Sequence, residues 1–128
     1  MSYDKEDVKK FRIQRAFDTL AEAELLFSDN RILGTVNRLY YACFYAISAF
    51  LYSKDINTST HSGVKISFNK ELIKTELIDS SYGKFFNTLF INRFEADYDD
   101  APDFSEEELK KMFPIVESLI KELERLVK

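Results

Sequence analysis

The chain has 128 residues, of which 45% are apolar and 31% charged, and its net charge at pH 7 is −4. These values indicate one globular domain spanning residues 1–128 and exclude a disordered tail. One cysteine and one histidine exclude an internal disulfide and a zinc site built from several histidines, and the acidic balance argues against a strong sequence-independent nucleic-acid binder.

The same composition bears on location and fold class. No apolar run approaches the roughly 20 residues that a membrane-spanning helix needs. The first residues are polar and acidic, so we expect no signal peptide, and the lone cysteine fits a reducing cytoplasm. Three glycines and two prolines are too few turn formers for a chain of many short strands. We therefore expect a cytoplasmic, all-α protein without a membrane segment.

Two long helices are predicted in the first half of the chain. Apolar residues recur at helical spacing over residues 4–28, with Asp4 as the expected N-cap. A second helix is predicted over residues 31–53, and it is apolar on nearly every side. A domain this small buries one face of such a helix in its own core, so we expect another face to contact a second copy of the chain. Three small residues of this helix would let a neighbouring backbone approach closely: Ala42, Ala46 and Ala49.

Two further helices are predicted before an acidic loop. Ser59 or Thr60 is expected to cap the third helix, and a break near residues 79–80 separates it from the fourth. Residues 97–103 then carry four aspartates. Their spacing is not that of an EF-hand loop, and the turn position has no glycine, so we expect a solvated loop rather than a metal site.

The last helix has the clearest amphipathic pattern in the chain. Ser105 and Glu108 have the spacing of a capping box at its start. Pro114 lies inside it, and the missing backbone donor predicts a kink or a break there. Helices of this length with short connections predict an antiparallel, up-and-down bundle of four or five helices.

Arg38 is the one charged residue inside the most apolar helix. An unpaired buried guanidinium is costly, so this side chain needs a partner or a water-filled groove. Two interpretations stay open: a structural ion pair with an aspartate, and a contact with an anion or phosphate in a groove between subunits. Cys43 lies on the core-facing stripe of the same helix, and we interpret it as a small buried hydrophobe rather than a nucleophile.

Two other places carry polar residues of interest. Arg93 and Asp97 are four residues apart and could pair on one helix face, or Asp97 could meet Arg38 across the bundle and define a polar pocket. His61 stands at the start of the third helix, where it is either a surface hydrogen-bonding residue or a general base.

Three motifs, taken in order, resemble the HEPN family (higher eukaryotes and prokaryotes nucleotide-binding): Asn37-Arg38-Leu39-Tyr40-Tyr41-Ala42, Thr60-His61-Ser62-Gly63-Val64, and the segment from Arg93 to Asp97-Tyr98-Asp99. The resemblance covers residues 8–127 and implies a helical bundle that forms a homodimer. Members of this family are often encoded beside a minimal nucleotidyltransferase and act as toxin–antitoxin pairs. Many are metal-independent ribonucleases with their active sites at the dimer groove.

The ribonuclease motif of that family is an arginine and a histidine with four to six residues between them. Arg38 matches the arginine, but the histidine positions hold Cys43, Phe44 and Tyr45. Phenylalanine has no proton to offer and a neutral tyrosine has a pKa near 10, so neither replaces an imidazole directly. The only histidine, His61, reaches the groove only if its helix folds back over Arg38.

The sequence thus favours a non-catalytic dimeric module that pairs through the second helix, uses no cofactor, and binds a nucleotide, an RNA segment or a partner nucleotidyltransferase. The candidate ligand-binding residues are Asn37, Arg38, Tyr41, His61, Arg93, Asp97 and Tyr98. The alternative is a metal-independent ribonuclease toxin with a degenerate site that uses Arg38 and His61. The resemblance also suggests that the partner enzyme attaches a nucleoside monophosphate to one of three tyrosines: Tyr40, Tyr41 or Tyr45.

Overall fold

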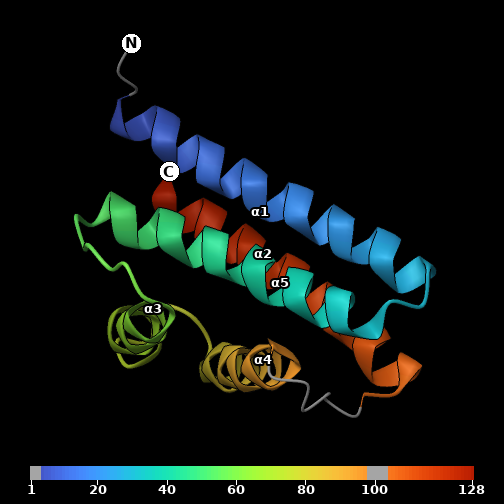
Figure 1. Ribbon diagram of the computed structural model, residues 1–128. Helices are drawn as coiled ribbons and strands as arrows, with labels where there is room; N and C mark the ends of the chain where they lie inside the picture. Colours follow the sequence, from blue (N-terminus) through green and yellow to red (C-terminus); the bar gives the residue numbers. More distant parts are fainter. Residues whose placement is uncertain (1–3, 98–103) are drawn as a thin grey trace.

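Figure 1 shows the computed structural model of the chain, a packed bundle of helices. The structure describes residues 4–97 and 104–128, except for the side chains of residues 94–97. Its elements are α1 (Lys5–Ser28), α2 (Ile32–Ser53), α3 (His61–Phe68), the π-helical turn η1 (Asn69–Ile73), α4 (Ser80–Asp97) and α5 (Glu106–Val127). The described residues contain no strand, so the predicted all-α fold is confirmed.

The helices do not all run in the same direction. Figure 1 shows α1, α2 and α5 lying side by side, with α2 antiparallel to α1, whereas α3 and α4 are seen end-on. The two shorter helices therefore cross below the other three. This crossing brings the first turn of α3 and the side of α4 against α2, which contacts each of the other α-helices.

Side-chain caps fix where three helices begin. Asp4 caps α1 as predicted, and Thr60 rather than Ser59 caps α3. Ser105 and Glu108 form the predicted capping box at the start of α5. These side chains satisfy backbone donors that the first turn of a helix leaves unpaired. The Thr60 cap also makes His61 the first residue of α3, at the end of that helix that lies against α2.

The predicted break at Pro114 does not occur, since α5 is one continuous helix from Glu106 to Val127. A proline inside a helix removes one backbone hydrogen bond and crowds the preceding turn. Buried apolar residues lie on both sides of it, with Leu109 before it and Val116 and Leu119 after it. We attribute the continuity of α5 to this packing, which outweighs the local penalty.

The alanines of α2 pack inside the protomer. Ala42, Ala46 and Ala49 are each 0% exposed in the single chain, as are Ala16 and Ala23 of α1. Small side chains at these places let α1 and α2 lie close along their length (Figure 1). The close approach predicted for the α2 alanines therefore occurs within one chain, and Ala42 has no surface left for a partner to contact.

The core accounts for most of the aromatic residues. Phe68 and Phe86 are fully buried, and the Phe86 ring stacks on Tyr40 with 5.4 Å between ring centroids. Phe11, on α1, is an exception, with 65% of its surface exposed. No helix among the described residues has the length and apolar character that crossing a membrane would require.

Candidate functional site

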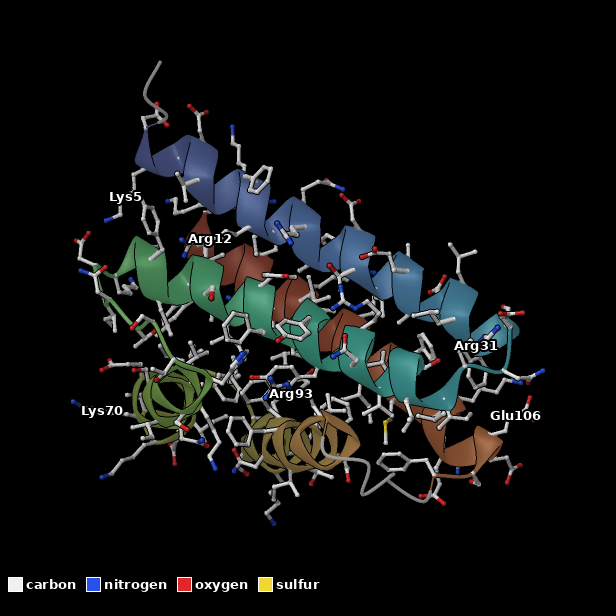
Figure 2. The ribbon with its side chains drawn as sticks, in the orientation of Figure 1. Lys5, Arg12, Arg31, Lys70, Arg93 and Glu106 are labelled. Carbon is white, nitrogen blue, oxygen red and sulfur yellow. The ribbon has the colours of Figure 1, made fainter. Side chains whose placement is uncertain are left out.

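Five side chains from three helices meet at the junction of α2, α3 and α4. We call them the His61 cluster: Arg38, Tyr40, Tyr41, His61 and Arg93. The two tyrosines and Arg38 come from α2, His61 begins α3, and Arg93 lies on α4. Figure 2 shows the Arg93 label between α4 and α2, where this junction lies. Four of the five were candidate ligand-binding residues from sequence, and the fold brings them together.

His61 is held between two phenol groups. Its Nδ1 lies 3.0 Å from the Tyr40 hydroxyl oxygen, and its Nε2 lies 3.4 Å from that of Tyr41. The ring is also 5.0 Å, centroid to centroid, from Phe44. The histidine that is distant from Arg38 in sequence thus reaches the tyrosines that follow Arg38 on α2. The shorter contact, with Tyr40, fixes the plane of the imidazole.

Tyr40 is buried completely, with 0% of its surface exposed. Burial raises the pKa of this phenol well above its ordinary value, although the nearby Arg93 opposes the shift. The hydroxyl is therefore neutral at physiological pH and can share a proton with His61 in a hydrogen bond. This burial also leaves the Tyr40 hydroxyl without the access that a modifying enzyme needs, whereas Tyr41 and Tyr45 are only partly buried.

The two arginines place positive charge on the tyrosine rings. The guanidinium carbon of Arg93 lies 5.5 Å from the centre of the Tyr40 ring and 5.9 Å from that of Tyr41. The guanidinium carbon of Arg38 lies 5.1 Å from the centre of the Tyr41 ring. Distances below about 6 Å are those of cation–π contacts. Tyr41 is thus the common neighbour of both arginines and of His61.

Arg38 has partners that the sequence did not predict. Its Nε and one terminal nitrogen donate to the Asn37 side-chain oxygen at 3.0 and 2.7 Å. Its partner among the described carboxylates is Glu22 of α1, 3.9 Å away. Because the Arg38 side chain is 29% exposed and that of Glu22 is 56% exposed, this pair is a weak one. Arg38 is therefore still able to bind an anion from solvent.

Some sequence hypotheses fall outside what the structure describes. The side chain of Asp97, and all of Tyr98, lie outside the described residues, as does the acidic segment up to residue 103. The pairing of Asp97 with Arg38 or Arg93 stays a prediction for that reason. Within the described part of the chain, no group of three or more His, Cys, Asp or Glu residues is placed to hold a metal ion.

Two contacts of the cluster were missed by sequence reasoning. Glu22 lies on α1 in a segment where charged residues alternate with apolar ones, and nothing distinguishes it from its neighbours. Phe44 occupies a position where a histidine was sought, yet its ring touches the histidine that is present. Cys43 is fully buried, and burial raises the pKa of its thiol, which confirms it as an inert core residue.

Comparison with known proteins shows the family of the chain. The HEPN domain matches residues 10–126 of the chain. This chain belongs to the HEPN family. A "UPF0332 protein" of Thermotoga maritima is 37% identical over 124 residues, which cover 97% of this chain and 94% of that protein.

Two HEPN relatives from Methanocaldococcus jannaschii each carry the name "Putative toxin". One is 36% identical over 96 residues, which cover 75% of this chain and 65% of that protein. The other is 29% identical over 117 residues, which cover 91% of this chain and 86% of that protein. The family resemblance inferred from the three motifs is therefore confirmed, and the residues matched by the family include the helices that build the His61 cluster.

Replacing Tyr40 with Phe tests the electrostatics of the cluster. Near neutral pH, Tyr40→Phe should lower the free energy of unfolding by about 1 kcal/mol, since it removes the hydrogen bond to His61. Burial raises the Tyr40 pKa in the folded state, so the unfolded chain loses this proton first as the pH rises past 10.0. Wild-type stability should fall above that pH, and the variant should lack this part of the fall.

Urea denaturation near pH 8 and near pH 11 measures both effects. The stability difference between wild type and variant should shrink at the higher pH, because only the wild type carries the Tyr40 proton. Cys43 also has a raised pKa and contributes equally to both proteins, so it cancels in the comparison. An unchanged difference at the two pH values would contradict the assignment of Tyr40 as a neutral, buried phenol.

Proposed function

We propose that the His61 cluster binds a phosphate-bearing ligand, a nucleotide or an RNA segment, and that the protein acts as a non-catalytic dimeric module. One observation carries the proposal. The guanidinium groups of Arg38 and Arg93 both lie over the Tyr41 ring, whose hydroxyl contacts His61. The proximity of two positive charges, an imidazole and an aromatic ring supports the binding of one small ligand at this junction.

These groups suit the two parts of a nucleotide. A guanidinium recognises phosphate through several N–H donors held in one plane, and an aromatic ring stacks on a base. The charge is local, because the chain as a whole carries −4 at pH 7. Binding would therefore depend on this site and not on a general attraction to polyanions. Asn37 supports it by accepting two hydrogen bonds from Arg38.

The relatives named as toxins support a toxin-like role for this protein. We infer a cytoplasmic toxin-like protein that pairs with a partner, for which a minimal nucleotidyltransferase is the leading hypothesis. Together they would form a toxin–antitoxin pair. Ligand binding by the purified chain alone is independent of this context.

Arg38→Ala should weaken the binding of a short fluorescent RNA and of a mononucleotide by at least tenfold. The reason is that a charge-assisted hydrogen bond to phosphate contributes about 1.5–3 kcal/mol. His61→Ala should also weaken the binding of both ligands, because it removes the imidazole that contacts the Tyr41 hydroxyl. Fluorescence anisotropy and calorimetric titration measure the two affinities.

Arg125→Ala is the matched control for these variants. It removes one exposed arginine from α5, where its partner is Glu122, outside the His61 cluster. The control should bind both ligands like the wild type. Equal affinities for wild type, Arg38→Ala and Arg125→Ala would refute the proposed site.

The dimer of this proposal forms through the face of α2 that the protomer leaves accessible. Tyr41 and Phe44 are partly buried on this face, whereas Ala42 is fully buried. Tyr41→Glu should therefore shift sedimentation toward the monomer while the protein stays folded. Ala42→Glu should instead unfold the protomer, because it buries a carboxylate in a packed interface. A folded Tyr41→Glu variant that sediments like the wild type would place the dimer interface elsewhere.

The position of His61 favours one alternative, a ribonuclease that uses Arg38 and His61. His61 and Arg38 both contact Tyr41, and the Nε2 contact to that hydroxyl is long enough at 3.4 Å for a ligand to displace it. The purified protein should cleave RNA in the presence of EDTA if this alternative holds. Cleavage by the wild type that both Arg38→Ala and His61→Ala lose would support the ribonuclease and overturn the non-catalytic module. RNA that the wild type leaves intact would exclude the ribonuclease.

A further inference from the structure

A second set of arginine–tyrosine contacts lies beside the His61 cluster, in the seam between α1 and α2. The guanidinium carbon of Arg12 is 4.8 Å from the centre of the Tyr52 ring, and that of Arg15 is 4.5 Å from the centre of the Tyr45 ring. We call these two pairs, together with the Arg38–Tyr41 pair, the Arg–Tyr seam. Figure 2 shows Arg12 beside α2, where the two helices run alongside each other.

The three tyrosines of the seam form one line on α2. Their positions, 41, 45 and 52, differ by four and seven residues, which is the spacing of a single helix face. With a rise of 1.5 Å per residue, the line is roughly 16 Å long. It begins at Tyr41, which also belongs to the His61 cluster, so the two surfaces are continuous.

Two arginines of the seam, Arg12 and Arg15, are not paired with a described carboxylate. Arg12 donates to the backbone oxygen of Ser48 at 3.2 Å, which keeps its guanidinium over Tyr52. Within residues 4–93 and 104–128, no carboxylate oxygen lies within 4.0 Å of a nitrogen of Arg12 or Arg15. The seam is therefore a row of positive charges on aromatic rings in an acidic protein.

A groove of about 520 Å³ is lined by two of the three arginines of the seam, Arg15 and Arg38. Its α1 side carries Phe11, whose surface is 65% exposed. The groove also holds two carboxylates: Asp18 accepts a hydrogen bond from Gln14, and Glu22 lies 3.9 Å from Arg38. The full lining is Phe11, Gln14, Arg15, Asp18, Thr19, Glu22 and Arg38.

We infer that the Arg–Tyr seam is a track for single-stranded nucleic acid that leads into the His61 cluster, so that the ligand is an oligonucleotide rather than a mononucleotide. The inference rests on the proposed function, because the track ends at that site. A guanidinium seated on a ring leaves its N–H edge available to phosphate and its outer face available to a base. Repeated over a line of aromatic residues, this arrangement is typical of proteins that bind single strands.

A second copy of the chain is a poorer occupant of the part of the seam that Arg12 and Arg15 form, which lies beyond the dimer face proposed at Tyr41 and Phe44. A two-fold interface sets the same surface of each subunit against itself. Here that would bring Arg12 and Arg15 toward their own counterparts, and like charges across an interface are unfavourable. A polyanion, in contrast, complements every arginine of the row.

The test measures RNA affinity as a function of length and salt. Wild type, Arg15→Gln and the double variant Arg12→Gln/Arg15→Gln are titrated with single-stranded RNAs from a dinucleotide upward. The double variant should bind the dinucleotide like the wild type and the longer RNAs at least tenfold more weakly. Each lost phosphate contact lowers the slope of log affinity against log salt by about 0.7, so the slope for long RNA should decrease by about 1.4.

Two controls keep the result interpretable. Arg125→Gln removes the same charge from α5 and should leave the length dependence unchanged. Arg12 also bonds the backbone, so the double variant could lose stability. The exposed Arg15→Gln substitution avoids this problem and should by itself lower the slope by about 0.7.

The outcomes separate the track from the site. The track would be overturned if both seam variants bind long RNA with the affinity of the wild type while Arg38→Ala binds it more weakly. The proposed function would then still stand. A seam variant that changes sedimentation but not RNA affinity would also overturn the track, since the seam would then be a contact between copies. A wild type that binds no RNA of any length would refute the proposed RNA-binding function and the track together.

Discussion

The buried hydroxyl of Tyr40 is the constraint on which the site depends. A phenol with no exposed surface needs a hydrogen-bond partner inside the protein, and here that partner is His61, 3.0 Å away. This hydrogen bond joins the first turn of α3 to the middle of α2. The same ring stacks on Phe86 and lies under Arg93, so α4 is drawn to the same point. One side chain thus sets the positions of two crossing helices relative to a third.

The apolar character of α2 explains why the polar groups gather where they do. Half of its 22 residues are buried, including the polar Thr35, whereas Arg38 and Tyr41 are only partly buried. Arg38 reaches out toward α1, and Tyr41 toward α3. The Arg–Tyr seam follows the α1 edge, and the His61 cluster follows the other edge. A helix that is buried on most sides therefore presents two narrow polar margins.

Local sequence patterns predicted what depends on local physics. The caps at Asp4 and Ser105 follow from side chains that bond the next turn, and each helix that they begin follows from apolar spacing. The break that Pro114 allowed does not occur, because the penalty of a proline is local, whereas the packing that outweighs it comes from distant residues. The α2 alanines were correctly expected to permit close approach, but periodicity does not say whether the neighbour belongs to the same chain.

The site itself was only half predictable for the same reason. Arg38, Tyr41 and His61 were all candidate ligand-binding residues from sequence, yet the contact between Tyr41 and His61 forms only because α3 crosses α2. Tyr41 and His61 sit on separate helices, so an unfolded or partly unfolded chain has no local remnant of the site. The contacts of the His61 cluster are consequently a property of the native state, and detachment of α3 alone would remove His61 from both tyrosines.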